Sequence, residues 1–257
     1  MKNNLTEKDI ETLNKFGLEI NDKEKIFNIE KLNISNDEIK YIPTEFFKLI
    51  NLEELFIYCR SLRKLSKEVG NLINLKELSI NRDDLTELPK EIGNLINLKK
   101  LYIDCKSLRK LSEDIKNLIN LKRLKISCYD LELTRKIGNI IKLETLYIIT
   151  NNLETLPSEI GKLINLETLY IWSDVDGLIE LPKEIGNLTN LKMLDIKCNN
   201  VKELPKEIYN LINLKALYIM SDNLGSFPDG IERLNNLEIL AIFGKPCNLK
   251  ILPIEEI

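Results

Sequence analysis

Apolar and polar residues recur along this chain with a period of about 23 residues. Leucine marks the period at Leu32, Leu55, Leu78, Leu101, Leu124, Leu146, Leu169, Leu194, Leu217 and Leu240. Successive leucines are 23 residues apart, except for one step of 22 and one of 25. A repeat of this length indicates a solenoid, in which about ten copies of one supersecondary unit stack on each other.

One repeat is best seen in LKELSINRDDLTELPKEIGNLIN, residues 75–97. We count places from its first residue, so that Leu75, Leu78 and Ile80 stand at places one, four and six. Alternation of these apolar places with polar ones predicts a short strand with one buried face. A turn follows, and apolar residues at three-residue spacing in PKEIGNLINL favour a short 3₁₀ turn on the return path.

These residues resemble leucine-rich repeat proteins of the 23-residue class, whose repeats read LxxLxIxxNxLxxLPxEIGxLxxL in bacterial and plant intracellular proteins. The resemblance covers approximately residues 28–253. It implies an α/β solenoid with a curved parallel sheet on the concave side and short helical returns on the convex side. It also implies recognition of a protein on the concave face, without identifying that protein.

The N-terminal segment has a different pattern. Thr6 is a suitable N-cap for a helix that starts at Glu7, and Ile10, Leu13 and Phe16 share one face of that helix. Terminal repeats need a polar outer cover, so we expect this helix to cap the stack. The predicted organisation is a helical cap over residues 1–27 and a solenoid of about ten repeats over residues 28–257, the last one incomplete.

The C-terminal segment GKPCNLKILPIEEI begins another turn and stops before a further strand. Two interpretations are open. Either this half repeat, with Leu249 and Leu252, covers the end of the stack, or the strand expected at residues 237–243 keeps an open edge. An open edge would favour weak end-to-end self-association.

Composition narrows the classes of function. The net charge is −3 with 30% charged residues, so there is no overall basic bias toward nucleic acid. No apolar run is as long as a membrane span requires, and the N-terminal sequence lacks the apolar core of a signal peptide. An odd number of cysteines, five, favours a reducing compartment. We therefore predict no membrane insertion and a cytoplasmic location, with export by a route independent of a signal peptide as the alternative.

Catalysis has little support in the sequence. The chain has no histidine, which removes the commonest general base and the commonest metal ligand. The glycines of EIGNL recur with the repeat and belong to its turn, not to a phosphate loop. We predict a non-enzymatic protein with no catalytic residues, metal or cofactor.

The resemblance places residues two, three, five, seven and eight of each repeat on the concave face. We call the apolar side chains there the aromatic patch: Tyr147, Ile149, Tyr170, Trp172, Met193, Tyr218, Met220 and Phe243. We call the cationic ones the basic stripe: Lys99, Lys100, Arg123 and Lys125, with Lys76, Arg82 and Lys122 beside them. Asp195 and Lys197 interrupt the aromatic patch.

Exposed aromatic and methionine side chains are typical of interface hot spots, and a basic surface steers acidic partners. These features predict a protein-binding face. The alternatives are that the tyrosines merely favour strands and support each other, or that a glycan or anionic polymer binds there. Binding through the basic stripe would weaken steeply with salt, whereas aromatic anchoring would barely respond.

Two further places of the repeat, places eight and nine, lead to predictions. Place nine is normally a buried Asn in this family, and Asn151 and Asn199 fit it, whereas the residues of repeats two, four and five do not: Arg60, Lys106 and Tyr129. Place eight carries four cysteines: Cys59, Cys105, Cys128 and Cys198. Cys105 and Cys128 are expected to be neighbours about 4.8 Å apart. We favour free thiols over a disulfide or a thiolate metal site.

Overall fold

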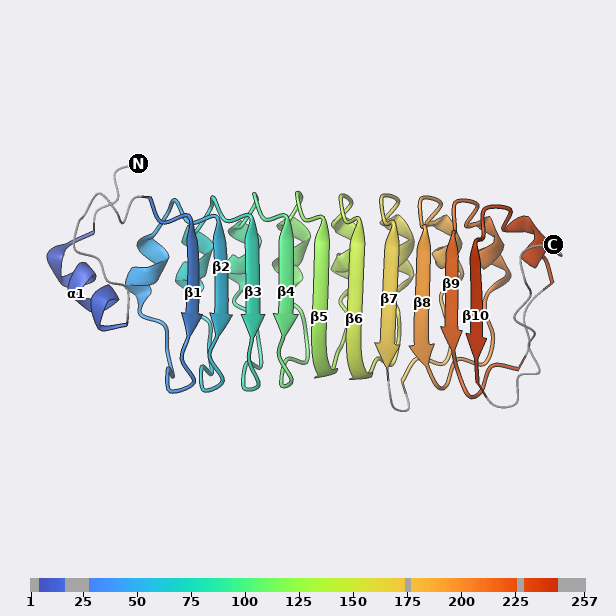
Figure 1. Cartoon of the computed structure of the whole chain (residues 1–257), viewed down its shortest axis with the longest axis horizontal. Coiled ribbons are helices and arrows are strands. Elements are labelled where there is room, and N and C mark those ends of the chain that lie inside the picture. Colours follow the sequence, from blue (N-terminus) through green and yellow to red (C-terminus); the bar gives the residue numbers. More distant parts are fainter. Residues whose placement is uncertain (1–4, 17–27, 174–176, 226–228, 245–257) are drawn as a thin grey trace.

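The computed structural model describes residues 5–16, 28–173, 177–225 and 229–244. Within these residues, ten strands form one parallel sheet in chain order, and the stack is elongated (Figure 1). The strands are β1 (Lys31–Ser35), β2 (Glu54–Tyr58), β3 (Glu77–Asn81), β4 (Lys100–Asp104), β5 (Arg123–Asp130), β6 (Thr145–Asn152), β7 (Thr168–Ser173), β8 (Met193–Cys198), β9 (Ala216–Met220) and β10 (Ile239–Phe243). The predicted solenoid is confirmed, and each repeat takes the number of its strand.

Short 3₁₀ helices lie behind the sheet in Figure 1. They are η1 (Thr44–Lys48), η2 (Lys67–Asn71), η3 (Lys90–Asn94), η4 (Glu113–Asn117), η5 (Arg135–Asn139), η6 (Ser158–Lys162), η7 (Lys183–Asn187), η8 (Lys206–Asn210) and η9 (Ile231–Arg233). Most follow a proline, whose fixed φ suits the start of a helix. Where proline is absent, a hydroxyl can cap: the Thr134 oxygen accepts from the Lys136 N–H at 3.3 Å, and Ser112 from Asp114 at 3.2 Å.

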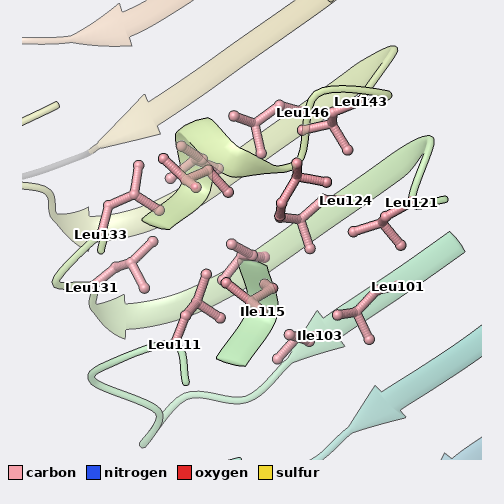
Figure 2. Packing of buried hydrophobic residues seen from close by; sticks show 14 of the residues in the cluster. Leu101, Ile103, Leu111, Ile115, Leu121, Leu124, Leu131, Leu133, Leu143 and Leu146 are labelled. Atoms are coloured by element: carbon pink, nitrogen blue, oxygen red, sulfur yellow. The ribbon is translucent and has the colours of Figure 1, made fainter. Parts of the chain in front are cut away.

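The register of the sheet joins the same place in neighbouring repeats. Leu101 pairs with Leu124, and Leu124 with Leu146, so each apolar place becomes a column along the stack. All three leucines are buried, and Figure 2 shows them one beside the next between the sheet and the returning helices. No single repeat could enclose these side chains, so the core exists only because repeats stack.

The predicted N-terminal helix is confirmed as α1 (Glu7–Lys15), at the β1 end of the stack (Figure 1). Thr6 and Asp9 form a capping box, each side chain accepting from the other's backbone N–H. Phe16 packs edge to face on Phe46, with ring centroids 6.0 Å apart, and Lys48 forms an ion pair with Asp9 at 2.8 Å. These contacts join α1 to the first repeat, whereas the expected boundary at residue 27 stays a prediction.

The C-terminal half repeat, with Leu249 and Leu252, lies outside the described residues. End-to-end self-association therefore stays a prediction. The last described strand, β10, pairs with β9 on one side, and its Ile242 is only partly buried against the core.

The prediction that place eight faces outward is wrong. From the second repeat to the ninth, the residue at this place is buried: Cys59, Arg82, Cys105, Cys128, Thr150, Ser173, Cys198 and Ser221. Strand alternation simply continues through places four, six and eight, which all point into the core. Arg82 therefore does not belong to the basic surface, because its side chain is 0% exposed.

The prediction of a buried Asn at place nine is also wrong, for the same reason. Asn151 is exposed, and this place forms a surface row along the turns. The charged residues that do not match the family's Asn are exposed at this place and form surface ion pairs: Lys106 pairs with Asp83 at 3.1 Å and Arg60 with Asp37 at 3.8 Å. Polar side chains at place eight supply the buried bonds instead, such as the Thr150 hydroxyl donating to the Tyr129 carbonyl at 2.8 Å.

An asparagine ladder does exist, but at the residue that precedes place one. Its side-chain amides donate to the carbonyl of a residue in the preceding repeat at 2.7–2.9 Å, and its members are Asn74, Asn97, Asn120, Asn165, Asn190, Asn213 and Asn236. The sequence signal was the recurring triplet INL. In repeat six Lys142 takes the place, and its ammonium donates to the Asn120 amide oxygen at 2.8 Å.

Candidate protein-binding face

The face of the sheet opposite the 3₁₀ helices is built from places three, five and seven of every strand. We call it the open face, and it faces the viewer in Figure 1. Period-two alternation puts these places on the side away from the core. The eight residues of the aromatic patch all lie on this face, on five adjacent strands from β6 to β10.

The middle of the aromatic patch is held by neighbouring side chains. The Tyr147 and Tyr170 rings lie 5.5 Å apart between centroids and are tilted by 42°. Tyr170, Trp172 and Tyr218 are half-buried, whereas the outermost residue, Phe243, is 50% exposed. These rings are therefore held in place by their neighbours and expose a large apolar surface. A partner that bound to them would lose less conformational entropy than on freely rotating side chains.

Lys197 joins the patch instead of interrupting it. Its ammonium nitrogen lies 3.8 Å from the centroid of the Trp172 ring, which is a cation–π contact. Asp195, by contrast, does interrupt the patch. Its strand register sets it directly between Tyr170 on β7 and Tyr218 on β9.

The structure divides the predicted basic stripe between two surfaces. Lys100, Arg123 and Lys125 lie on the open face, where Lys100 is neutralised by Glu77 at 2.8 Å, a contact that raises the pKa of this lysine. Arg123 and Lys125 are exposed and have no ion pair within the described residues. They are the uncompensated charges of the stripe on the open face, and Lys125 pairs in register with Tyr147 at the border of the aromatic patch.

Lys99 lies before β4, at the edge of the sheet and not on the open face. There it lines a groove of about 360 Å³ together with lysines of neighbouring repeats, Lys76, Lys122 and Lys142. Lys76 pairs with Glu53 and Lys122 with Glu144, both at 2.6 Å. These pairs remove much of the net charge that the sequence pattern indicated.

The four described cysteines are free, buried thiols at place eight. Burial raises the pKa of Cys105, Cys128 and Cys198 to about 12 in each case. Within the described residues, no group of three or more Cys, Asp or Glu side chains is arranged to hold a metal ion.

Iodoacetamide is expected to leave these four cysteines unlabelled in the folded chain at about pH 8, because the thiolate is the reacting species and burial suppresses it. Mass spectrometry of the digested protein measures labelling site by site. The same reaction in urea without a reducing agent should label all four and thereby exclude a bridge between Cys105 and Cys128. Labelling of the folded and unfolded samples at equal rates would contradict the burial of place eight.

None of the helices in the described part of the chain combines the length and the apolar character needed to cross a bilayer.

Comparison with known proteins supports the repeat architecture. A family model described as leucine-rich repeat region matches residues 9–132 and 173–252. A leucine-rich repeat protein of Leptospira interrogans is 29% identical with a TM-score of 0.71, over 86% of this chain and 62% of that one. The chain thus spans less than two thirds of that protein's length.

Two further structures share the fold at lower identity. The leucine-rich repeat domain of the type III effector XopL is 24% identical with a TM-score of 0.72, over 91% of this chain and 88% of that one. Internalin C2 of Listeria monocytogenes is 19% identical with a TM-score of 0.54, over 85% and 83%. No curated protein sequence matches this chain.

Proposed function

Because this chain belongs to the leucine-rich repeat family, we propose that it is a non-enzymatic recognition module that binds a protein partner on the open face of its sheet. The aromatic patch is the observation that carries this proposal. It gathers Tyr147, Tyr170, Trp172, Tyr218 and Met220 on one surface, where they contribute nothing to the continuous core on the other side of the sheet. Such side chains dominate the energy of protein interfaces.

Charged residues beside the aromatic patch indicate how the partner would be oriented on the open face. Arg123 and Lys125 lie on β5, next to the Tyr147 end of the patch. Unpaired cations at the rim of an interface accelerate association with an acidic segment and set its orientation. The partner should therefore place acidic residues over β5 and apolar residues over β6 to β10.

Replacing Tyr170 and Trp172 together with alanine is expected to abolish partner capture while leaving the fold nearly unchanged. Both side chains project from the open face, so their loss creates no cavity in the core. Capture from cell lysates measures the first effect, and thermal unfolding followed by circular dichroism measures the second. The matched control is Tyr129→Ala, which removes an exposed tyrosine at place nine of β5, outside the aromatic patch on β6 to β10.

The control should capture the same protein as the wild-type chain. Equal capture by the double variant would reject the aromatic patch as the binding site. A drop of more than a few degrees in its melting temperature would instead show that the rings serve mainly to support neighbouring strands.

A further inference from the structure

One carboxylate lies within the aromatic patch. On the described strands β6 to β10, places three, five and seven carry aliphatic, aromatic, Thr, Ala and Met side chains, together with Lys197 and a single acid, Asp195. Its register neighbours are Tyr170 on one side and Tyr218 on the other. The open face thus presents one negative charge in the middle of its largest apolar area.

Asp195 has no hydrogen bond or ion pair in the described structure, although it is half-buried. Other carboxylates on this face have partners: Glu54 pairs with Lys31 and Glu77 with Lys100, both at 2.8 Å, and Asp104 accepts a hydrogen bond from the Asn81 amide at 3.3 Å. Lys197, two residues along the same strand, lies over the Trp172 ring instead. Burial alone raises the pKa of Asp195, so the charged form is left without compensation.

An unpaired carboxylate between two tyrosine rings has a defined chemical complement. A guanidinium or ammonium group placed there would form a charge-assisted bond in surroundings that exclude water. The flanking rings of Tyr170 and Tyr218 add cation–π attraction. A neutral or acidic side chain would instead bury this charge unpaired, which disfavours such partners.

We propose that Asp195 determines the specificity of the open face and that the bound segment presents an arginine or lysine to it, flanked by apolar residues. This inference rests on the proposed function and deepens it. The partner segment then has a fixed polarity. Its acidic part lies over Arg123 and Lys125 on β5, and its basic side chain lies on β8.

The test is selection of a random peptide library displayed on phage against the immobilised full chain. Parallel selections use Asp195→Asn, the Tyr170→Ala/Trp172→Ala double variant and Asp222→Asn, a control that removes an exposed carboxylate at place nine. Selected peptides are synthesised and titrated against each chain by isothermal titration calorimetry, because the double variant lacks Trp172, the only tryptophan in the chain. Wherever a selected peptide carries a basic residue, a second version replaces it with glutamine.

Peptides selected on wild type are expected to share an arginine or lysine beside apolar residues. Its replacement by glutamine should weaken binding to wild type and to Asp222→Asn by about tenfold or more, and should barely affect binding to Asp195→Asn. Peptides that lack a basic residue, or that bind Asp195→Asn equally well, overturn the role of Asp195 but leave the open face as a binding surface. Binding that survives in the double variant, or failure to select any peptide, overturns the proposed function as well.

Folding of Asp195→Asn is checked by thermal unfolding. An acid whose pKa is raised in the folded state adds stability below its unfolded pKa, and this stability is lost as the pH rises through the folded value. At neutral pH the charged Asp195 is therefore unfavourable, and the variant should melt at or above the wild-type temperature.

Discussion

Replacing Gly186 with alanine is expected to destabilise the solenoid by about 3 kcal/mol, because overpacking a close-packed contact costs this much where the neighbour cannot move. A Cβ atom on Gly186 would lie 2.3 Å from the backbone oxygen of Glu207 and 2.7 Å from its Cβ. Both atoms belong to the next 3₁₀ helix, whose distance is fixed by the sheet register. Denaturation by urea measures the change.

Gly225→Ala is the matched control for this substitution. The nearest atom to its added Cβ is the Lys202 carbonyl oxygen at 3.7 Å, which is ordinary contact, so stability should stay within about 0.5 kcal/mol of wild type. Equal midpoints for the two variants would mean that neighbouring 3₁₀ helices separate easily. The sheet register would then not fix the distance between these helices.

Gly186 belongs to a column of glycines that occupy the same place in several 3₁₀ turns. The same place in the EIGN-type turn brings a Cβ within 2.4–2.7 Å of the next repeat's backbone at four other positions: Gly70, Gly93, Gly138 and Gly161. The sequence showed these glycines as a recurring turn, and the structure gives their reason. At these positions only a residue without a side chain fits against the next 3₁₀ helix, whereas η4 and η8 carry Lys116 and Tyr209 at the same place.

The period, the strands and the face of each apolar residue could be predicted from the sequence, because they depend on alternation within one repeat. Leu101 and Leu124 had to be buried whatever their neighbours were. The residue at which each strand ends could not be predicted from the alternation alone. Whether Cys105 continues the strand face or begins the turn depends on backbone bonds to the next repeat, where its N–H donates to the Ser127 carbonyl at 2.8 Å.

Contacts between repeats were the part that sequence reasoning missed. The ladder that includes Asn97 depends on a carbonyl 24 residues earlier, at Ile73, which no local pattern identifies. The same holds for the open face. Lys100 is neutralised by Glu77, whereas Asp195 stays unpaired. This difference depends on side-chain positions on neighbouring strands, and the proposed role of Asp195 rests on it.

Replacing Arg82 with methionine is expected to stabilise the chain by about 3 kcal/mol, within the range gained when a buried charge gives way to an apolar side chain of similar volume. Arg82 is 0% exposed, and none of its three guanidinium nitrogens has a hydrogen-bond partner in the described structure. Burial lowers its pKa, because the charged form is disfavoured where water is excluded. The melting temperature should rise by roughly 6–12 °C for a chain of this size.

The control for Arg82→Met is Arg60→Met, at place nine of the preceding repeat. Its side chain is 78% exposed and its ion pair with Asp37 spans 3.8 Å, so the change should stay within about 0.5 kcal/mol. The flanking repeats carry Cys59 and Cys105 where repeat three has Arg82, which shows that this column accepts small apolar groups. A lower melting temperature for Arg82→Met would mean that the guanidinium finds partners in solution, and that the turn of repeat three opens to provide them.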